Sequence, residues 1–201
     1  MEQSENIFLR VLNIFANFVF LNVLWFICCI PIITILPATT AMYGVINKWH
    51  HDGLDYGLAS LFFDKFRENF RRSFITGILG LFSGFILLLN WTILYSADFN
   101  GEFFISVLFS FMLVIFVFIS VYISYIIERY RQTVFESIKQ ALFLSISHLF
   151  LTLSCIILII GFLLIAVYVP VFFIITGSTI AFIQYYIFDK VIKKYHYVTN
   201  K

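Results

Sequence analysis

The sequence is poor in charged residues. Asp, Glu, Lys and Arg make up 12% of its 201 residues, about half their share in an average soluble domain, whereas 62% of the residues are hydrophobic. A soluble domain of this size cannot bury so much apolar surface, and a disordered chain does not carry it, so both classes are excluded. The apolar stretches are continuous rather than alternating, which excludes a membrane barrel. The composition therefore predicts an all-α, polytopic helical membrane protein.

Cysteines and catalytic motifs are also scarce. The three cysteines at 28, 29 and 155 lie in apolar stretches, and their spacing indicates neither a disulfide framework nor a zinc site. The chain contains no nucleotide-binding loop, no GxSxG and no HExxH. No acidic or basic residue falls at the middle of an expected span, where ion-coupled transporters keep them. We therefore expect no enzyme and no cofactor, and the net charge of +2 does not indicate nucleic-acid binding.

Four stretches without charged residues set the number of membrane spans, namely 11–47, 73–97, 103–127 and 140–188. A helical span needs about 20 apolar residues, so the two middle stretches hold one span each. The last stretch is long enough for two spans, divided at Pro170 because proline breaks a helix. The sequence thus predicts five spans, at about 13–36, 74–96, 103–127, 147–169 and 171–189.

The segment after the first span is ambiguous. Pro37 suits the first turn of a new helix, and apolar residues then recur at helical spacing, at 38, 41, 42, 45, 46 and 49. A helix over 37–50 is about 20 Å long and too short to cross, so we expect it at half depth or at the interface. If 31–49 crosses the membrane instead, the chain has six spans.

The turn between Pro31 and Pro37 lacks two backbone donors and should leave helical geometry. Irregular backbone at membrane depth persists only where protein or water satisfies it. We therefore expect this turn to pack inside the bundle, with hydroxyls of Thr34, Thr39 or Thr40 bonding the freed backbone groups. The alternative is a simple kink in one longer span.

The basic residues predict the orientation. All Lys and Arg residues except Arg10 fall in 48–72, 128–146 and the C-terminal tail, which share one side in the five-span topology. Because basic loops favour the cytoplasm, we expect the C-terminus inside and the N-terminus outside. Within the first segment, 58–70 should form an amphipathic helix, suited either to the headgroup layer or to docking on the bundle. Its apolar stripe is Ala59, Phe62, Phe63, Phe66 and Phe70.

Two groups of polar residues are candidates for function. His50, His51, Asp52 and Asp55 could offer metal ligands, but their spacing matches no strong motif, so a solvated loop is favoured. The first helix carries a polar face that could line a cavity or grip another helix. Packing is favoured, because amides commonly bond between membrane helices. That face consists of Gln3, Asn6, Arg10, Asn13 and Asn17.

The run LNVLWFICCIPIITILPATTAMY, from Leu21 to Tyr43, resembles the hallmark of the YesL-like family of uncharacterised bacterial integral membrane proteins. The later run FFDKFRENFRRS, 62–73, is similar to a second block of that family. The resemblance implies several helices, a plasma-membrane location and an association with carbohydrate uptake, and it implies no known activity, cofactor or catalytic residue. The residues that carry the hallmark are Asn22, Trp25, Pro31, Thr34, Pro37, Ala38, Ala41 and Tyr43.

Two functions from different classes remain. The first is a non-catalytic accessory or interaction protein, whose partners are the lipid bilayer and another membrane protein such as a carbohydrate transporter. The alternative is a small transporter or channel component. A polar cavity at mid-membrane would favour transport, whereas a closed, dry bundle with an exposed cytoplasmic groove would favour interaction.

Overall fold

The computed structural model describes residues 2–53, 57–96, 102–169 and 172–199. All regular structure in these ranges is helical, and they contain no strand, so the predicted all-α class is confirmed. The helices are α1 (Glu2–Cys29), η1 (Ile32–Thr34), α2 (Ile35–Asp52), α3 (Leu58–Ser96), α4 (Glu102–Arg129), α5 (Val134–Ser147), α6 (Leu149–Tyr168) and α7 (Phe173–Thr199).

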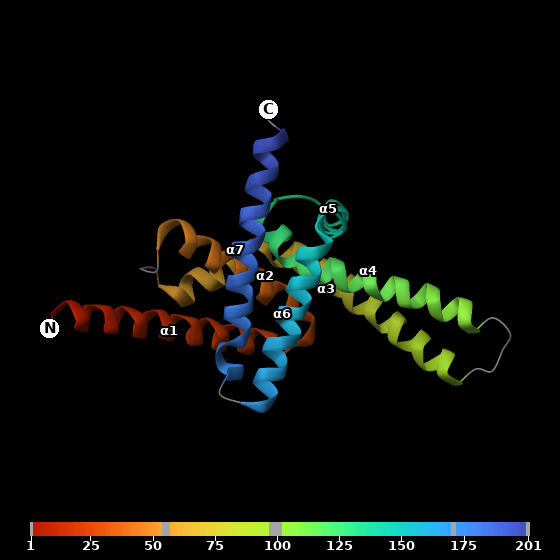
Figure 1. Cartoon of the computed structure of the whole chain (residues 1–201), viewed down its shortest axis with the longest axis horizontal. Helices are drawn as coiled ribbons and strands as arrows, with labels where there is room; N and C mark the ends of the chain where they lie inside the picture. The colour runs from red at the N-terminus through yellow and green to blue at the C-terminus, as the bar shows by residue number, and fades with distance from the viewer. Residues whose placement is uncertain (1, 54–56, 97–101, 170–171, 200–201) are drawn as a thin grey trace.

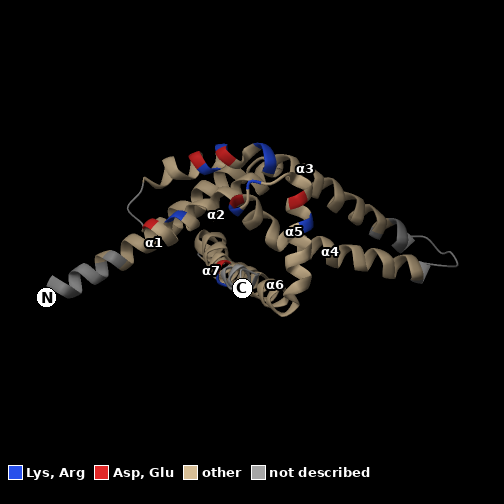
Figure 2. Cartoon of the chain, turned by 90° about the horizontal axis from the view of Figure 1, so that it is seen from above, with Lys and Arg blue, Asp and Glu red and all other residues tan. Residues whose placement is uncertain are grey.

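Two helical hairpins, α3–α4 and α6–α7, leave a common centre in different directions (Figure 1). α1 extends from this centre on the side opposite the α3–α4 hairpin, and α2 lies in the centre, against α1, α3, α4 and α7. Seen from above, α3 and α4 lie lengthwise whereas α6 and α7 are seen end-on (Figure 2).

Four helices of the described chain are long and apolar enough to cross a membrane. The qualifying segments are Val11–Cys29, Leu58–Asn90, Phe104–Arg129 and Leu149–Tyr168. The first four expected spans, 13–36, 74–96, 103–127 and 147–169, overlap these segments. The fifth, 171–189, falls largely in α7, which is not among them, and Pro170 lies outside the described residues. The five-span count and the orientation stay predictions.

Charged residues gather around the centre of the molecule and on α5 (Figure 2). α3 beyond Arg72, residues 104–127 of α4 and all of α6 carry none. In the part of the chain that the structure describes, the charged residues thus lie around the centre, from which the charge-free parts of α3, α4 and α6 project.

The amphipathic segment 58–70 and the span 74–96 are parts of one continuous helix, α3. Nothing between them breaks a helix, since 58–76 holds neither proline nor glycine. Of the predicted apolar stripe only Phe62 is fully buried, and Phe63 is exposed. The buried face runs instead through Leu58, Phe62, Asn69 and Ser73.

The turn between the prolines is more exposed than the sequence predicts. Ile32 is 65% exposed and Ile33 46%, so the expectation that this turn packs inside the bundle is wrong for its first half. Burial is not needed here, because the Thr34 hydroxyl donates to the carbonyl oxygens of Cys28 and Pro31, both at 2.6 Å. The bond to Cys28 satisfies one of the backbone carbonyl oxygens that have no partner within the helix at the end of α1.

Pro37 does lie in the first turn of the next helix, which begins at Ile35. Thr39 and Thr40 do not cap that helix. Their hydroxyls donate one turn back, to the carbonyl oxygens of Ile35 (2.7 Å) and Leu36 (2.8 Å). Thr34 precedes the helix, and its hydroxyl bonds backwards rather than into α2.

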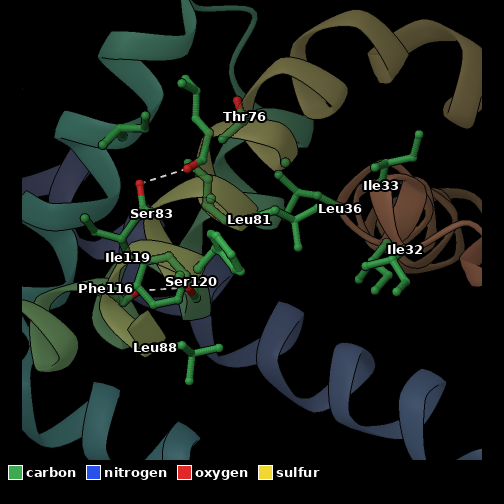
Figure 3. Close-up of a pocket in the computed structure, with 18 residues that line it drawn as sticks. Ile32, Ile33, Leu36, Thr76, Leu81, Ser83, Leu88, Phe116, Ile119 and Ser120 are labelled. Atoms are coloured by element: carbon green, nitrogen blue, oxygen red, sulfur yellow. Dashed lines mark hydrogen bonds between the residues drawn. The ribbon is translucent and has the colours of Figure 1, made fainter. Parts of the chain in front are cut away.

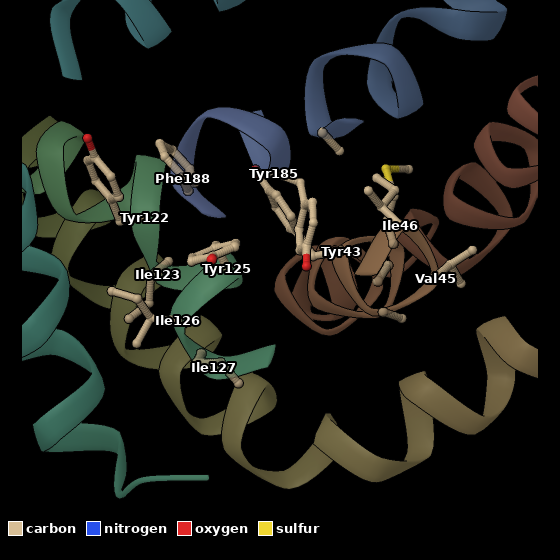
Figure 4. Packing of buried hydrophobic residues seen from close by; sticks show 14 of the residues in the cluster. Tyr43, Val45, Ile46, Tyr122, Ile123, Tyr125, Ile126, Ile127, Tyr185 and Phe188 are labelled. Atoms are coloured by element: carbon tan, nitrogen blue, oxygen red, sulfur yellow. The ribbon is translucent and has the colours of Figure 1, made fainter. Parts of the chain in front are cut away.

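The core of the molecule is built around α2. All six residues of its predicted apolar face are buried, and so are Thr40 and Tyr43 on the other face. Figure 4 shows Tyr43 of α2 beside Tyr185 of α7, with Tyr125 of α4 next to them. The rings of Tyr43 and Tyr125 are 6.1 Å apart, and those of Tyr125 and Tyr185 are 5.6 Å apart. Because α1, α3, α4 and α7 all pack against α2, both its apolar and its polar faces are covered, and ten of its 18 residues are buried.

Candidate functional site

Asn22, the first residue of the hallmark, joins α1 to the start of α7. Its Nδ2 donates to the carbonyl oxygens of Phe173 (3.0 Å) and Ile174 (2.6 Å), and its Oδ1 accepts the Ser178 amide N–H (3.2 Å). Gly177 permits this approach, because a Cβ added there would lie 2.5 Å from Asn22 Oδ1. Asn22 is fully buried, so the contact fixes the α1–α7 packing.

The rest of the hallmark holds α2 in place. The Trp25 indole Nε1 donates to Thr39 Oγ1 (3.1 Å), and the Tyr43 hydroxyl donates to Gln184 Oε1 (2.5 Å). The hallmark thus forms a junction of α1, α2 and α7. Of its other members, Pro37, Ala38 and Ala41 are buried in the core, Thr34 bonds the end of α1, and Pro31 is exposed.

A polar cluster that the sequence did not predict joins α2, α4 and α7 near the centre of the molecule. The Tyr185 hydroxyl donates to Asn47 Oδ1 (2.6 Å), and Asn47 Nδ2 donates to Glu128 Oε1 (2.9 Å). Asn47 therefore bonds α7 with one end of its amide and α4 with the other. Because both partners come from different helices, this side chain holds three helices in register.

An ion pair extends the cluster. Arg129 Nη1 lies 3.1 Å from Asp189 Oδ1, and the Asp189 side chain is only 5% exposed. His50 approaches the same carboxylate, with Nε2 at 3.8 Å from Oδ2, and its ring lies 5.9 Å from that of Tyr185. Glu128 and Asp189 stand at the ends of apolar stretches in the sequence, and that position was the signal that could have pointed to a packed polar site.

The histidine group does not form a metal site among the described residues, where no three His, Cys, Asp or Glu side chains converge. His50 and His51 belong to the last turn of α2 rather than to a loop, and their rings lie 5.2 Å apart. His50 faces Asp189, whereas Asp52 pairs with Lys48. Asp55 lies outside the described residues.

The polar face of α1 is described only in part, since the side chains of Gln3, Asn6 and Arg10 lie outside the described residues. Asn17 Nδ2 donates to Asn13 Oδ1 within the helix, at 3.4 Å. Asn13 is exposed and Asn17 half-buried. In the described part of this face, therefore, the two amides bond each other.

An open apolar groove of about 590 Å³ lies between η1, the start of α2, α3, α4 and α5 (Figure 3). Its hydroxyl groups, on Thr76, Ser83 and Ser120, donate to carbonyl oxygens of their own helices, each at 2.8 Å. The rest of the lining is hydrocarbon and glycine. The groove therefore offers apolar contact and almost no hydrogen bonding; we call it the α3 groove.

Two comparisons with known proteins find sequence similarity. A family model described as "Protein of unknown function, DUF624" matches residues 18–91, which include the hallmark, all of α2 and most of α3. The "Uncharacterized protein YesL" of Bacillus subtilis (strain 168) is 27% identical over 149 residues, covering 71% of this chain and 70% of that protein. No solved structure gives a significant match. These matches confirm the resemblance of this chain to the YesL-like family of uncharacterised proteins.

Proposed function

We propose that this chain is a non-catalytic accessory protein of the bacterial plasma membrane, which associates with another membrane protein such as a carbohydrate transporter. The carbohydrate link comes from the family resemblance. The proposal that the chain is not an enzyme comes from the sequence, which carries none of the common catalytic motifs. The association itself is supported by the geometry of α1.

The observation that carries the proposal is the exposed surface of α1 over residues 11–17, which we call the outer part of α1. This part projects away from the other helices (Figure 1), and Val11, Leu12 and Phe15 on it are each more than half exposed. The Asn13 and Asn17 amides lie on the same part, and they bond only weakly to each other at 3.4 Å. An apolar helix segment that carries an exposed amide at Asn13 and a half-buried amide at Asn17 is suited to pack against a neighbouring helix.

The physical reason is the cost of an unsatisfied amide in hydrocarbon. A buried amide without a partner costs about 1–3 kcal/mol by mutational measures. Interhelical bonds from such groups contribute about 1–2 kcal/mol in model peptides. A partner helix that bonds Asn13 and Asn17 would satisfy both groups at once.

The alternative, a small transporter or channel component, has less support. In the described part of the chain the buried Asn22 and Tyr43 and the half-buried Asn47 use their polar groups to join helices. The α3 groove is open but apolar. Neither feature supplies the polar path that a small hydrophilic solute needs.

The test is co-purification from bacterial membranes in mild detergent, with quantification of the recovered membrane proteins. The Asn13→Leu/Asn17→Leu variant stays apolar and loses both amides. Two interhelical bonds of about 1 kcal/mol each correspond to a drop in affinity of about 30-fold. We expect recovery of a carbohydrate-transport subunit to fall accordingly.

The matched control is Asn90→Leu, since Asn90 lies on α3 and bonds only the Ile86 carbonyl oxygen of its own helix (2.9 Å). It should leave recovery unchanged. Equal recovery with the Asn13→Leu/Asn17→Leu variant would contradict the proposal. Sugar flux through the purified chain alone in proteoliposomes would favour the transport alternative.

A further inference from the structure

The helix α5 turns large apolar side chains outward and small ones inward. Phe135 is 76% exposed, Phe143 67% and Ile146 55%, and we call these three residues the outer stripe of α5. At about 100° per residue they share about 80° of arc on the helix. The buried residues on the opposite side are all small, namely Ser137, Ala141 and Ser145. A surface helix of a soluble protein has the reverse arrangement, with its apolar stripe facing the core.

The small inward face allows α5 to pack closely on α4. The Ser137 hydroxyl donates to the Thr133 carbonyl oxygen (3.0 Å), and the Ser145 hydroxyl donates to the Leu142 carbonyl oxygen (2.9 Å). Both buried hydroxyls are therefore satisfied within α5. Close approach through small residues is how helices associate in a bilayer, where apolar side chains gain little by leaving lipid. The inward face of α5 is thus built for packing in a membrane.

Both ends of α5 lie next to apolar helical segments of membrane length. Residues 130–133 connect it to the segment Phe104–Arg129, and His148 alone separates it from the segment Leu149–Tyr168. α5 itself has 14 residues and is about 21 Å long, too short for a hydrocarbon core of about 30 Å. If the two neighbouring segments cross the membrane, α5 therefore begins and ends at the same membrane surface.

The direction of α5 agrees with this position. Figure 1 shows α5 end-on, whereas α4 and α6 are seen from the side in the same view. In Figure 2, which is turned by 90°, α5 is seen from the side and runs across α4. A helix that lies crosswise to a membrane-spanning helix runs along the membrane surface. This holds for α5 whether the upright neighbour is α4 or α6.

Lys139 indicates which surroundings the outer stripe fits. It is exposed and falls within the arc of the stripe, about 40° from Phe135. A protein helix placed over the stripe would bury the ammonium group, and a buried charge without a partner is costly. At a membrane surface the lysine stem lies along the apolar layer while the ammonium reaches the headgroups. The nearest acid in the sequence, Glu136, already accepts the Thr133 amide N–H (3.0 Å).

We propose that α5 docks on one leaflet of the bilayer, with Phe135, Phe143 and Ile146 at the boundary between acyl chains and headgroups. The Lys139 ammonium then lies among the lipid phosphates. This docking surface rests on the proposed membrane location. It adds a lipid contact away from the outer part of α1 and needs no partner protein.

The experiment measures the depth of single spin labels from their collisions with oxygen, which concentrates in hydrocarbon, and with a water-soluble nickel chelate. The full chain, with alanine in place of Cys28, Cys29 and Cys155, is reconstituted in vesicles of phosphatidylethanolamine and phosphatidylglycerol. Labels are attached to Phe143→Cys or Ile146→Cys. We expect both labels to lie about 5–10 Å inside the headgroup boundary, the depth of an interfacial helix.

Two further labels give the reference depths. Asp64→Cys lies on the exposed charged surface of α3 and should report water, whereas Val107→Cys lies on the exposed, charge-free part of α4 and should report hydrocarbon. If the labels at 143 and 146 meet the nickel chelate as often as the label at 64, the proposed lipid contact is wrong. If they are shielded from both oxygen and nickel, a protein covers the stripe, and the proposed lipid contact is wrong as well.

The label at 107 separates this failure from that of the membrane location. Water at 107 would remove the membrane location, and the docking of α5 with it. Hydrocarbon at 107 together with water at 143 and 146 would remove only the docking of α5. The charge is tested by Lys139→Glu, which should make the label at 146 shallower in vesicles containing phosphatidylglycerol than in vesicles of phosphatidylcholine alone. Equal depths in the two lipids would contradict the contact of Lys139 with phosphate.

Discussion

The short helix α2 is more buried than the long helix α4, although α4 is the more apolar of the two. α2 mixes apolar, small and polar residues, and ten of its 18 residues are buried. The span Phe104–Arg129 of α4 has a mean hydropathy of 2.9, yet none of its residues from Phe104 to Ser120 is buried. The more apolar helix forms the outside of this molecule, and the mixed helix forms its centre.

This inversion follows from the surroundings that we propose. In a lipid bilayer an apolar side chain gains little by leaving lipid for protein, so helices associate through close packing and hydrogen bonds. α2 supplies both, with Ala38, Ala41 and Gly44 for close approach and Tyr43 and Asn47 for bonding. α4 supplies them only near its charged end, where Val121 to Ile127 are buried.

Overpacking should distinguish the two helices most strongly. Ala41 is fully buried in α2, so Ala41→Phe forces neighbouring helices apart and should cost about 3 kcal/mol or more. Val107 is 53% exposed on α4, and Val107→Phe should cost close to nothing. The thermal midpoint of each purified variant in detergent measures this. A similar loss in both variants would mean that α4 is covered in the protein as it exists, and the contrast would fail.

A second pair of variants compares asparagines. Asn47→Leu removes the bonds to Tyr185 and Glu128 and leaves a carboxylate half-buried without its partner, which should cost about 2–3 kcal/mol. Asn90→Leu on the outer hairpin removes only a bond to its own helix and should be neutral or slightly stabilising. Equal midpoints for the two variants would show that the Asn47 bonds contribute nothing to the helix junction.

The sequence predicts the helices better than it predicts their surroundings. Periodicity identified the apolar face of α2 correctly, and all six of its residues are buried. It missed Thr40 and Tyr43, because a periodic pattern assumes that one face stays open. On α3 it selected the aromatic stripe, whereas Asn69 and Ser73 share the buried face with Phe62. In both helices, small and polar residues pack inward where a soluble protein would place apolar ones.

The polar cluster could not be predicted from spacing. Asn47, Glu128 and Tyr185 lie on three helices and are separated by more than fifty residues each, and only the packing of α2 between α4 and α7 brings them together. The α3 groove has a partial signal, since Gly77, Gly80 and Gly84 recur at helical spacing. Their spacing indicates a smooth face, but not whether a helix or a lipid covers it.

The ion pair at the base of the cluster should matter less than the Asn47 bonds. Asp189→Asn keeps the shape and removes the charge that faces Arg129. Breaking a fully buried pair costs about 3–5 kcal/mol, but the Arg129 side chain is 25% exposed and can be hydrated, so we expect about 1–2 kcal/mol. Asp64→Asn, on the exposed surface of α3, is the control. A loss as small as that of the control would show that water already screens the pair.

The smallest expected effect concerns the first turn of α5, which belongs neither to the buried centre around α2 nor to the exposed part of α4. Thr133 and Glu136 form a capping box at the start of α5, in which Glu136 accepts the Thr133 amide N–H at 3.0 Å and Thr133 Oγ1 accepts the Glu136 amide N–H at 3.4 Å. These bonds hold the pKa of the Glu136 carboxyl below its ordinary value.

Because the pKa of Glu136 is lower in the folded state, its carboxylate stabilises the fold above the unfolded pKa of about 4.3. That stabilisation is lost as the pH falls through the folded pKa. Glutamine can complete the same box without titrating. Glu136→Gln should therefore leave the thermal midpoint at pH 7 nearly unchanged and flatten its fall between pH 5 and pH 3, in the background of all other carboxylates. A Thr133→Ala chain loses the hydroxyl that accepts the Glu136 amide N–H but keeps the backbone N–H that the Glu136 carboxylate accepts, so the same Glu136→Gln change should still flatten that slope there. If the two pH profiles with Thr133 present run parallel, the cap does not depend on the carboxylate, and α5 starts where it does because of its packing against α4.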